Sequence, residues 1–204
     1  MHGGGWRRGD KAGSDQPGDG ADISPWFATL NRGRYVWFSI NYRLAPAHRW
    51  PACLEDLQTA VRWVKAHAAE YNADAGVLGG IGWSSGGHAI VLSSMRPDDP
   101  RYTAVPLPEA PALDARLAFV IAGWPVIDPW ARYGFAKAAG NAGMVTPAFL
   151  LHVSPPTLSL RPNQKSMLAP LSAGVLPNIP GFLNAALPAS FPDVSDTFKS
   201  IYTY

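Results

Sequence analysis

Two short glycine-rich motifs carry residues whose types and spacing suit nucleophilic acyl transfer. The first is His-Gly-Gly-Gly-Trp at residues 2–6, and the second is Gly-Trp-Ser-Ser-Gly at residues 82–86. Consecutive glycines let backbone N–H groups point into one concavity, which is the geometry that binds an oxyanion. The Gly-x-Ser-x-Gly spacing places a serine on a tight turn between a strand and a helix. The two motifs therefore predict an oxyanion loop and a nucleophile, Ser84.

A serine hydroxyl needs a neighbouring base, and in a hydrolase with this elbow the acid and the histidine follow the serine along the chain. Only His88 and His152 follow Ser84. His88 falls on the helix after the elbow and is interpreted as a packing residue. His152 is the remaining candidate base, and Asp128 is its candidate acid because strand C-terminal ends face the ligand side of a parallel sheet.

The elements that must position these residues alternate between strand and helix. Residues 34–40 are aromatic and β-branched and predict a strand, as do residues 75–81 and 116–122. Residues 51–71 predict an amphipathic helix, and a buried helix should begin at residue 86. The pattern predicts an α/β fold with a mostly parallel sheet flanked by helices.

A third stretch, Tyr-Arg-Leu-Ala-Pro at residues 42–46, makes a resemblance specific. Together with both glycine motifs, residues 124–129 and the helix residues Asp56, Ala60 and Trp63, it resembles the hormone-sensitive-lipase-like branch of the α/β-hydrolases. The resemblance implies hydrolysis of short-chain acyl esters by a serine nucleophile. It also implies residue roles, with His2 and Gly3 in the loop motif and the oxyanion donors at Gly4, Gly5 and Ser85.

The second half of the chain departs from the family's pattern. Pro-Pro-Thr-Leu is present at residues 155–158, but Arg-Pro-Asn stands at 161–163 where the family's acid turn should follow, and no histidine lies beyond residue 152. We therefore expect the acid and base of the triad to be missing and ester turnover to be weak or absent. We also expect the chain to be incomplete at both ends, with a partial α/β-hydrolase core at 1–140 and an irregular, proline-rich tail at 141–204.

Composition narrows the remaining function classes. Net charge is only +2, so no nucleic-acid partner is predicted, and no run of about 18 apolar residues predicts a membrane span. The one cysteine and five scattered histidines predict no metal site, and no cofactor is expected. A dinucleotide site is disfavoured because Ser85 stands where its third glycine belongs. The prediction is a cytoplasmic esterase that acts on small-molecule esters. The alternative is an inactive fragment, or an interaction protein built on a hydrolase scaffold.

Overall fold

The computed structural model describes residues 1–14, 19 and 21–143. Its secondary-structure elements are α1 (Pro25–Arg32), α2 (Ala52–His67), β1 (Gly79–Trp83), α3 (Ser85–Met95), β2 (Phe119–Gly123) and α4 (Pro129–Ala138), with short 3-10 turns at Ala68–Tyr71 and Ala75–Val77. All but residues 141–143 of the predicted tail lies outside the described residues, so the boundary at residue 140 stays a prediction.

The centre of the described fold is a pair of parallel strands. β1 and β2 run in register from Gly79 opposite Phe119 to Trp83 opposite Gly123. The other edge of β1 is hydrogen-bonded to the first residue, because the Met1 amine donates to the Ile81 carbonyl at 2.6 Å and the Trp83 N–H donates to the Met1 carbonyl at 3.3 Å. The glycine loop at residues 2–6 therefore begins beside the C-terminal end of β1.

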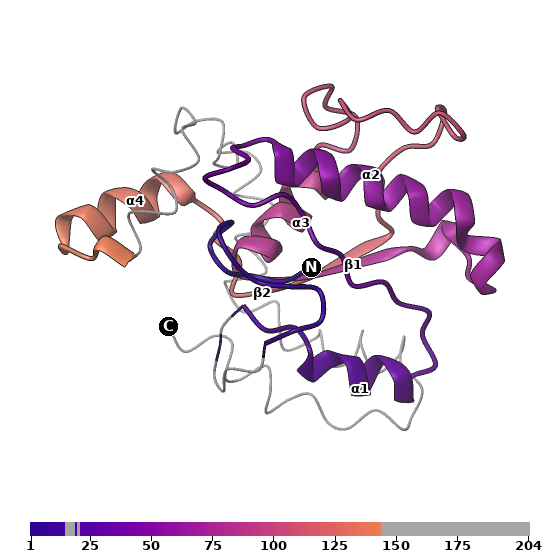
Figure 1. Cartoon of the computed structure of the whole chain (residues 1–204), viewed down its shortest axis with the longest axis horizontal. Coiled ribbons are helices and arrows are strands. Elements are labelled where there is room, and N and C mark those ends of the chain that lie inside the picture. Colours follow the sequence, from indigo (N-terminus) through magenta and orange to yellow (C-terminus); the bar gives the residue numbers. More distant parts are fainter. Residues whose placement is uncertain (15–18, 20, 144–204) are drawn as a thin grey trace.

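Two helices cover one side of these strands and α1 lies on the other (Figure 1). α3 is buried on every side from Ser85 to Ser93, as its uncharged sequence predicts. α2 packs over α3 through its apolar stripe, and the four residues that the spacing predicts are all buried: Leu54, Leu57, Val61 and Val64. Helix α2 with the following 3-10 turn confirms the helix predicted over 51–71.

The predicted strands differ in how well they match. β2 lies within three residues of the predicted 116–122, and β1 begins at Gly79 because Asp74 caps a 3-10 turn over the first residues of the predicted 75–81. The strand predicted over 34–40 is wrong, since these residues are neither helix nor strand. Tyr35 and Val36 are exposed, and β-propensity fixes a strand only where a neighbouring strand accepts its hydrogen bonds.

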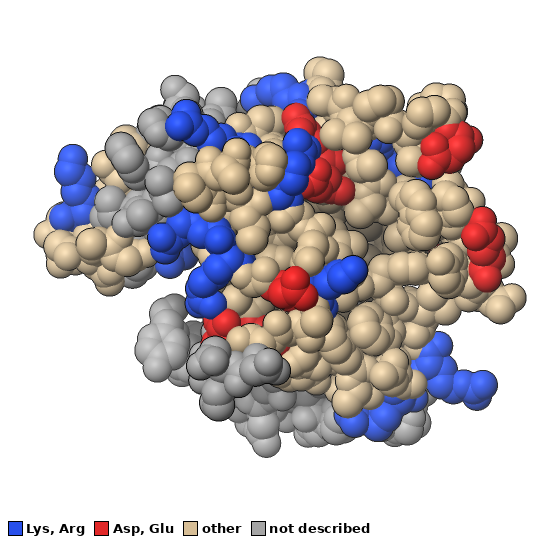
Figure 2. Space-filling model, viewed as in Figure 1, with Lys and Arg blue, Asp and Glu red and all other residues tan. Residues whose placement is uncertain are grey.

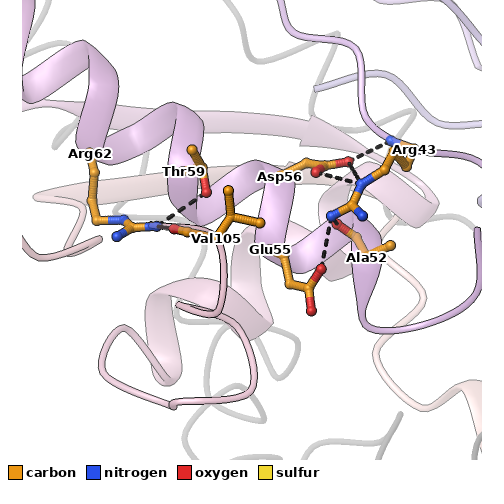
Figure 3. A network of polar contacts seen from close by, with 7 residues as sticks. All are labelled: Arg43, Ala52, Glu55, Asp56, Thr59, Arg62 and Val105. Atoms are coloured by element: carbon orange, nitrogen blue, oxygen red, sulfur yellow. Dashed lines mark hydrogen bonds and ion pairs between the residues drawn. The ribbon is translucent and has the colours of Figure 1, made fainter. Parts of the chain in front are cut away.

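A polar network fixes the segment 42–46 onto the start of α2 (Figure 3). The Arg43 backbone N–H and its Nε donate to the two oxygens of Asp56 at 2.7 and 2.8 Å, and a terminal nitrogen of Arg43 donates to Glu55 at 2.8 Å. The carboxylate thus satisfies two donors of one residue. Charge-assisted hydrogen bonds of this kind are stronger than neutral ones and hold the chain in one register.

Charge is otherwise spread over the surface. Figure 2 shows Lys and Arg side chains in several separate groups, with acidic side chains beside some of them and largely uncharged surface between. None of the helices in the described part of the chain is both long enough and apolar enough to cross a bilayer.

The Arg43 network gives a stability prediction with a matched control. Asp56→Asn turns an NH2 group toward one of the two Arg43 donors, so we expect the free energy of unfolding to fall by about 1–2 kcal/mol. Asp98→Asn removes the same charge from an ion pair with Arg116 in which both side chains are 61% exposed, and should change stability by less than about 0.5 kcal/mol. Urea denaturation followed by circular dichroism measures both. Equal midpoints for the two variants would contradict the structural role of Asp56.

Candidate active site

Ser84 lies at the junction between β1 and α3 in a conformation that few residues adopt. Its φ of 51° and ψ of −116° are the mirror image of a common extended conformation. Three backbone hydrogen bonds hold it there: its N–H donates to Gly123 at 2.9 Å, and its carbonyl accepts from His88 at 3.0 Å and from Val126 at 3.4 Å. This is the strained strand-to-helix turn that the Gly-x-Ser-x-Gly spacing predicts.

The elbow glycines are required by close backbone contacts. A Cβ atom on Gly82 would lie 2.5 Å from the Gly86 carbonyl oxygen. A Cβ atom on Gly86 would overlap the His2 carbonyl oxygen and lie 2.7 Å from that of Met1. The start of the glycine loop therefore rests directly on the first turn of α3, and the two sequence motifs meet in space.

The glycine loop itself turns sharply through residues with positive φ. Gly4, Gly5 and Trp6 have φ values of 103°, 62° and 60°. The Gly4 carbonyl closes the turn by accepting from the N–H groups of Arg7 and Arg8 at 3.2 and 3.3 Å. At Gly4 a side chain would also overlap the carbonyl of Arg8, so only glycine fits there.

Three N–H groups near the elbow are available to a ligand. Within the part of the chain that the structure describes, the N–H groups of Gly4, Gly5 and Ser85 donate to no carbonyl or side chain. Ser85 is the first residue of α3, and the first N–H groups of a helix have no partner within the helix. These are the three donors predicted for the oxyanion, and a helix N-terminus behind Ser84 also favours negative charge. Their assignment stays a prediction.

His2 belongs to the framework of the loop. Its imidazole is buried, stacks on the Tyr42 ring at 4.4 Å, and has its Nδ1 2.8 Å from the Gly3 carbonyl oxygen. Because a carbonyl only accepts, Nδ1 carries the hydrogen. Burial lowers the pKa of His2, an effect that the bond to Gly3 opposes. The sequence singles out Tyr42 only as the first residue of the motif at 42–46, and nothing in that motif predicts its contact with His2.

The predicted acid and base are less well defined. Asp128 follows β2 and caps α4, with its Oδ1 accepting from the Ala131 N–H at 3.0 Å. His152 lies outside the described residues. His88 is buried on α3 between the rings of Trp6 and Trp50, as expected for a packing residue. Within residues 1–14, 19 and 21–143, no side chain is hydrogen-bonded to Ser84 Oγ, so the pairing of Asp128 with His152 stays a prediction.

The described ranges contain no group of three or more His, Cys, Asp or Glu side chains placed to hold a metal ion. Cys53 is buried on α2, and burial raises the pKa of its thiol. A buried thiol with a raised pKa is unreactive.

Comparisons with known proteins match the region that holds both motifs. The BD-FAE family model matches residues 1–130. The probable carboxylic ester hydrolase LipM of Mycobacterium tuberculosis is 36% identical over 100 residues, covering 49% of this chain and 21% of LipM. The esterase LipC of the same organism is 40% identical over 75 residues, covering 37% of this chain and 18% of LipC. The matches thus cover about a fifth of these relatives' length.

A solved structure resembles the described fold. The acetyl ester-xyloside bifunctional hydrolase from Caldicellulosiruptor lactoaceticus superposes with a TM-score of 0.51 at 25% identity, covering 75% of this chain and 54% of the other. This structural match covers a larger share of the chain than the sequence matches to LipM and LipC do.

The strain at Ser84 predicts a difference between two variants that both remove the nucleophile. Glycine adopts this φ and ψ freely, whereas alanine does not. Strain of this kind costs the alanine variant on the order of 1–3 kcal/mol, which glycine avoids. The extra conformational freedom of glycine in the unfolded chain offsets about 0.5–1 kcal/mol of that advantage. Ser84→Gly should therefore be more stable than Ser84→Ala by about 1 kcal/mol in urea denaturation. Ser84→Ala as the more stable variant would contradict the strained conformation.

The contact at Gly86 predicts a large effect of a single methyl group. Gly86→Ala should separate the glycine loop from α3 and lower the free energy of unfolding by about 2 kcal/mol or more, because the atoms that the methyl group meets are backbone atoms of Met1 and His2. Gly134→Ala is the control. Gly134 lies on α4 with nothing within 4 Å of an added Cβ, so alanine there should raise stability by about 0.5–1 kcal/mol. Similar effects of the two substitutions would count against the contact.

Proposed function

The chain belongs to the BD-FAE family and has the fold of the α/β-hydrolases, and on that premise we propose that it hydrolyses carboxylic esters through Ser84. The observation that carries the proposal is the contact at Gly86, which sets the glycine loop beside the serine elbow. The matched relatives are named a probable carboxylic ester hydrolase, LipM, and an esterase, LipC. This supports both the reaction and its class of substrate, a small-molecule ester.

The proposed reaction has two stages. Ser84 Oγ attacks the ester carbonyl carbon as a base removes the hydroxyl proton, and the carbonyl oxygen becomes an anion that the N–H groups of Gly4, Gly5 and Ser85 stabilise. The tetrahedral species collapses, the C–O bond to the alcohol breaks, and the alcohol leaves with the proton. Water then attacks the acyl group on Ser84, and cleavage of that second ester releases the acid and restores the hydroxyl.

The substrate class and the base are the finer parts of the proposal. We propose short-chain acyl esters, in line with the acetyl ester named for the structurally similar Caldicellulosiruptor hydrolase. His152 is the candidate base and Asp128 its acid. The alternative is an interaction protein on a hydrolase scaffold. It is favoured by one observation, that no side chain in the described ranges is hydrogen-bonded to Ser84 Oγ. A cytoplasmic location stays a prediction from the sequence.

A fluorophosphonate probe separates the two functions, because only an activated serine reacts readily with it. Labelling of the protein but not of Ser84→Ala would support ester hydrolysis through Ser84. Turnover of a p-nitrophenyl butyrate ester should exceed that of Ser84→Ala, and the ratio measures how complete the catalytic set is. An intact triad contributes roughly 10⁶-fold, whereas the oxyanion donors and binding alone leave about 10³–10⁴-fold over water. No labelling, with turnover equal to that of Ser84→Ala, would favour the interaction protein.

Two further variants test the acid and base. His152→Ala should abolish turnover above the Ser84→Ala level if His152 is the base. Asp128→Asn keeps an oxygen that accepts from Ala131, so α4 stays capped, but it removes the charge that a histidine base needs. A loss of about 10⁴-fold in turnover with unchanged stability would identify Asp128 as the acid. Unchanged turnover would limit Asp128 to its capping role.

A further inference from the structure

Tyr42 is a buried side chain that is hydrogen-bonded to the glycine loop. Only 5% of the residue is exposed. Its hydroxyl donates to the carbonyl oxygens of His2 and Gly3, each at 3.1 Å, and its ring stacks on the His2 imidazole with 18° between the planes. One phenol therefore holds two successive carbonyl groups of the glycine loop.

The bond to Gly3 fixes the direction of a predicted oxyanion donor. The Gly3 carbonyl and the Gly4 N–H belong to the same planar peptide unit and point in opposite directions. Holding the oxygen toward Tyr42 therefore turns the Gly4 N–H away from Tyr42. His2 Nδ1 donates to the same oxygen at 2.8 Å, so this peptide is held by two donors. Glycine on both sides of that peptide would otherwise leave it free to rotate.

The segment that carries Tyr42 is itself held at both ends. The Ala45 N–H donates to the Trp6 carbonyl at 2.8 Å, so residues 42–45 contact the glycine loop at its beginning and at its end. Arg43, the next residue after Tyr42, is fixed to Asp56 and Glu55 on α2 (Figure 3). Tyr42 thus acts from a rigid support, which is what a positioning group requires.

We infer that Tyr42 is a positioning residue that holds the Gly3–Gly4 peptide so that the Gly4 N–H faces the oxyanion formed at Ser84. The inference deepens the proposed ester hydrolysis and rests on it for its effect on rate. Its effect on loop structure does not depend on that function. Burial raises the pKa of Tyr42, so the phenol keeps its proton and remains a donor throughout the usual pH range.

The kinetic test removes the hydroxyl alone. Tyr42→Phe should lower kcat for p-nitrophenyl butyrate by about 10–100-fold, less than the roughly 10²–10³-fold loss on deleting an oxyanion donor, because the N–H is misaligned and not removed. KM should change by less than about 3-fold, since the loop acts on the transition state. Tyr102→Phe is the control. Tyr102 is another buried phenol of the same core, but within the described residues its ring contacts are to Trp50 and Arg101 and not to the glycine loop, so its variant should keep the parent kcat.

A second readout is independent of catalysis. The Gly3 N–H donates to the Ala21 carbonyl, and the N–H groups of Arg7 and Arg8 donate to the Gly4 carbonyl. The exchange of these amides with deuterium therefore reports how well ordered the glycine loop is. In a peptide covering residues 2–9, Tyr42→Phe should speed exchange by about 10-fold or more, while a peptide from α2 keeps its parent rate. Tyr102→Phe should leave the loop peptide unchanged.

The outcomes separate the two proposals. Faster loop exchange with a lower kcat supports both. Faster loop exchange in a protein that neither reacts with the fluorophosphonate nor turns over ester removes the proposed function but leaves Tyr42 as the residue that holds the loop. Parent-like loop exchange in Tyr42→Phe overturns the inference, whatever the activity. Equal acceleration in the loop and α2 peptides also overturns it, because it would mark a general loss of stability.

Discussion

The contact between Gly86 and the His2 carbonyl is the constraint on which the candidate site depends. It brings two backbones together with no room for a side chain, and it does so two residues after Ser84. Because the loop and α3 touch here, the glycine loop lies beside the serine elbow. Glycine is needed in these motifs both because two backbone segments approach closely and because the loop turns through positive φ values.

The strained serine depends on the elements around it. The Ser84 conformation is unfavourable by itself, and its N–H and carbonyl are held by Gly123 at the end of β2 and by Val126 just beyond it. The parallel pairing of β1 with β2 therefore does more than bury apolar surface. It places the Gly123 carbonyl where it accepts from the N–H of Ser84, the proposed nucleophile, so that strand pairing and the strained conformation are coupled.

The segment 42–46 links the helical layer to the same site. Arg43 bonds to the carboxylates of α2, and its neighbour Tyr42 points the other way, into the glycine loop. The apolar stripe of α2 is packed in the core, so the helix gives this segment a fixed support. An ordered site of this kind needs supporting groups whose own positions are locked by packing and hydrogen bonds.

The sequence by itself determined the local features. The 3,4 spacing of apolar residues located α2, the uncharged run after Ser84 located α3, and the glycine spacing located the elbow. Only the tertiary structure decided whether residues 34–40 pair as a strand, because pairing needs a partner that propensity does not contain. It likewise decided that Asp128 caps α4 and that Tyr42 reaches the Gly3 carbonyl, 39 residues away in sequence. Periodicity and motif spacing encode contacts within one element, whereas contacts between distant segments arise only when the chain folds around a shared core.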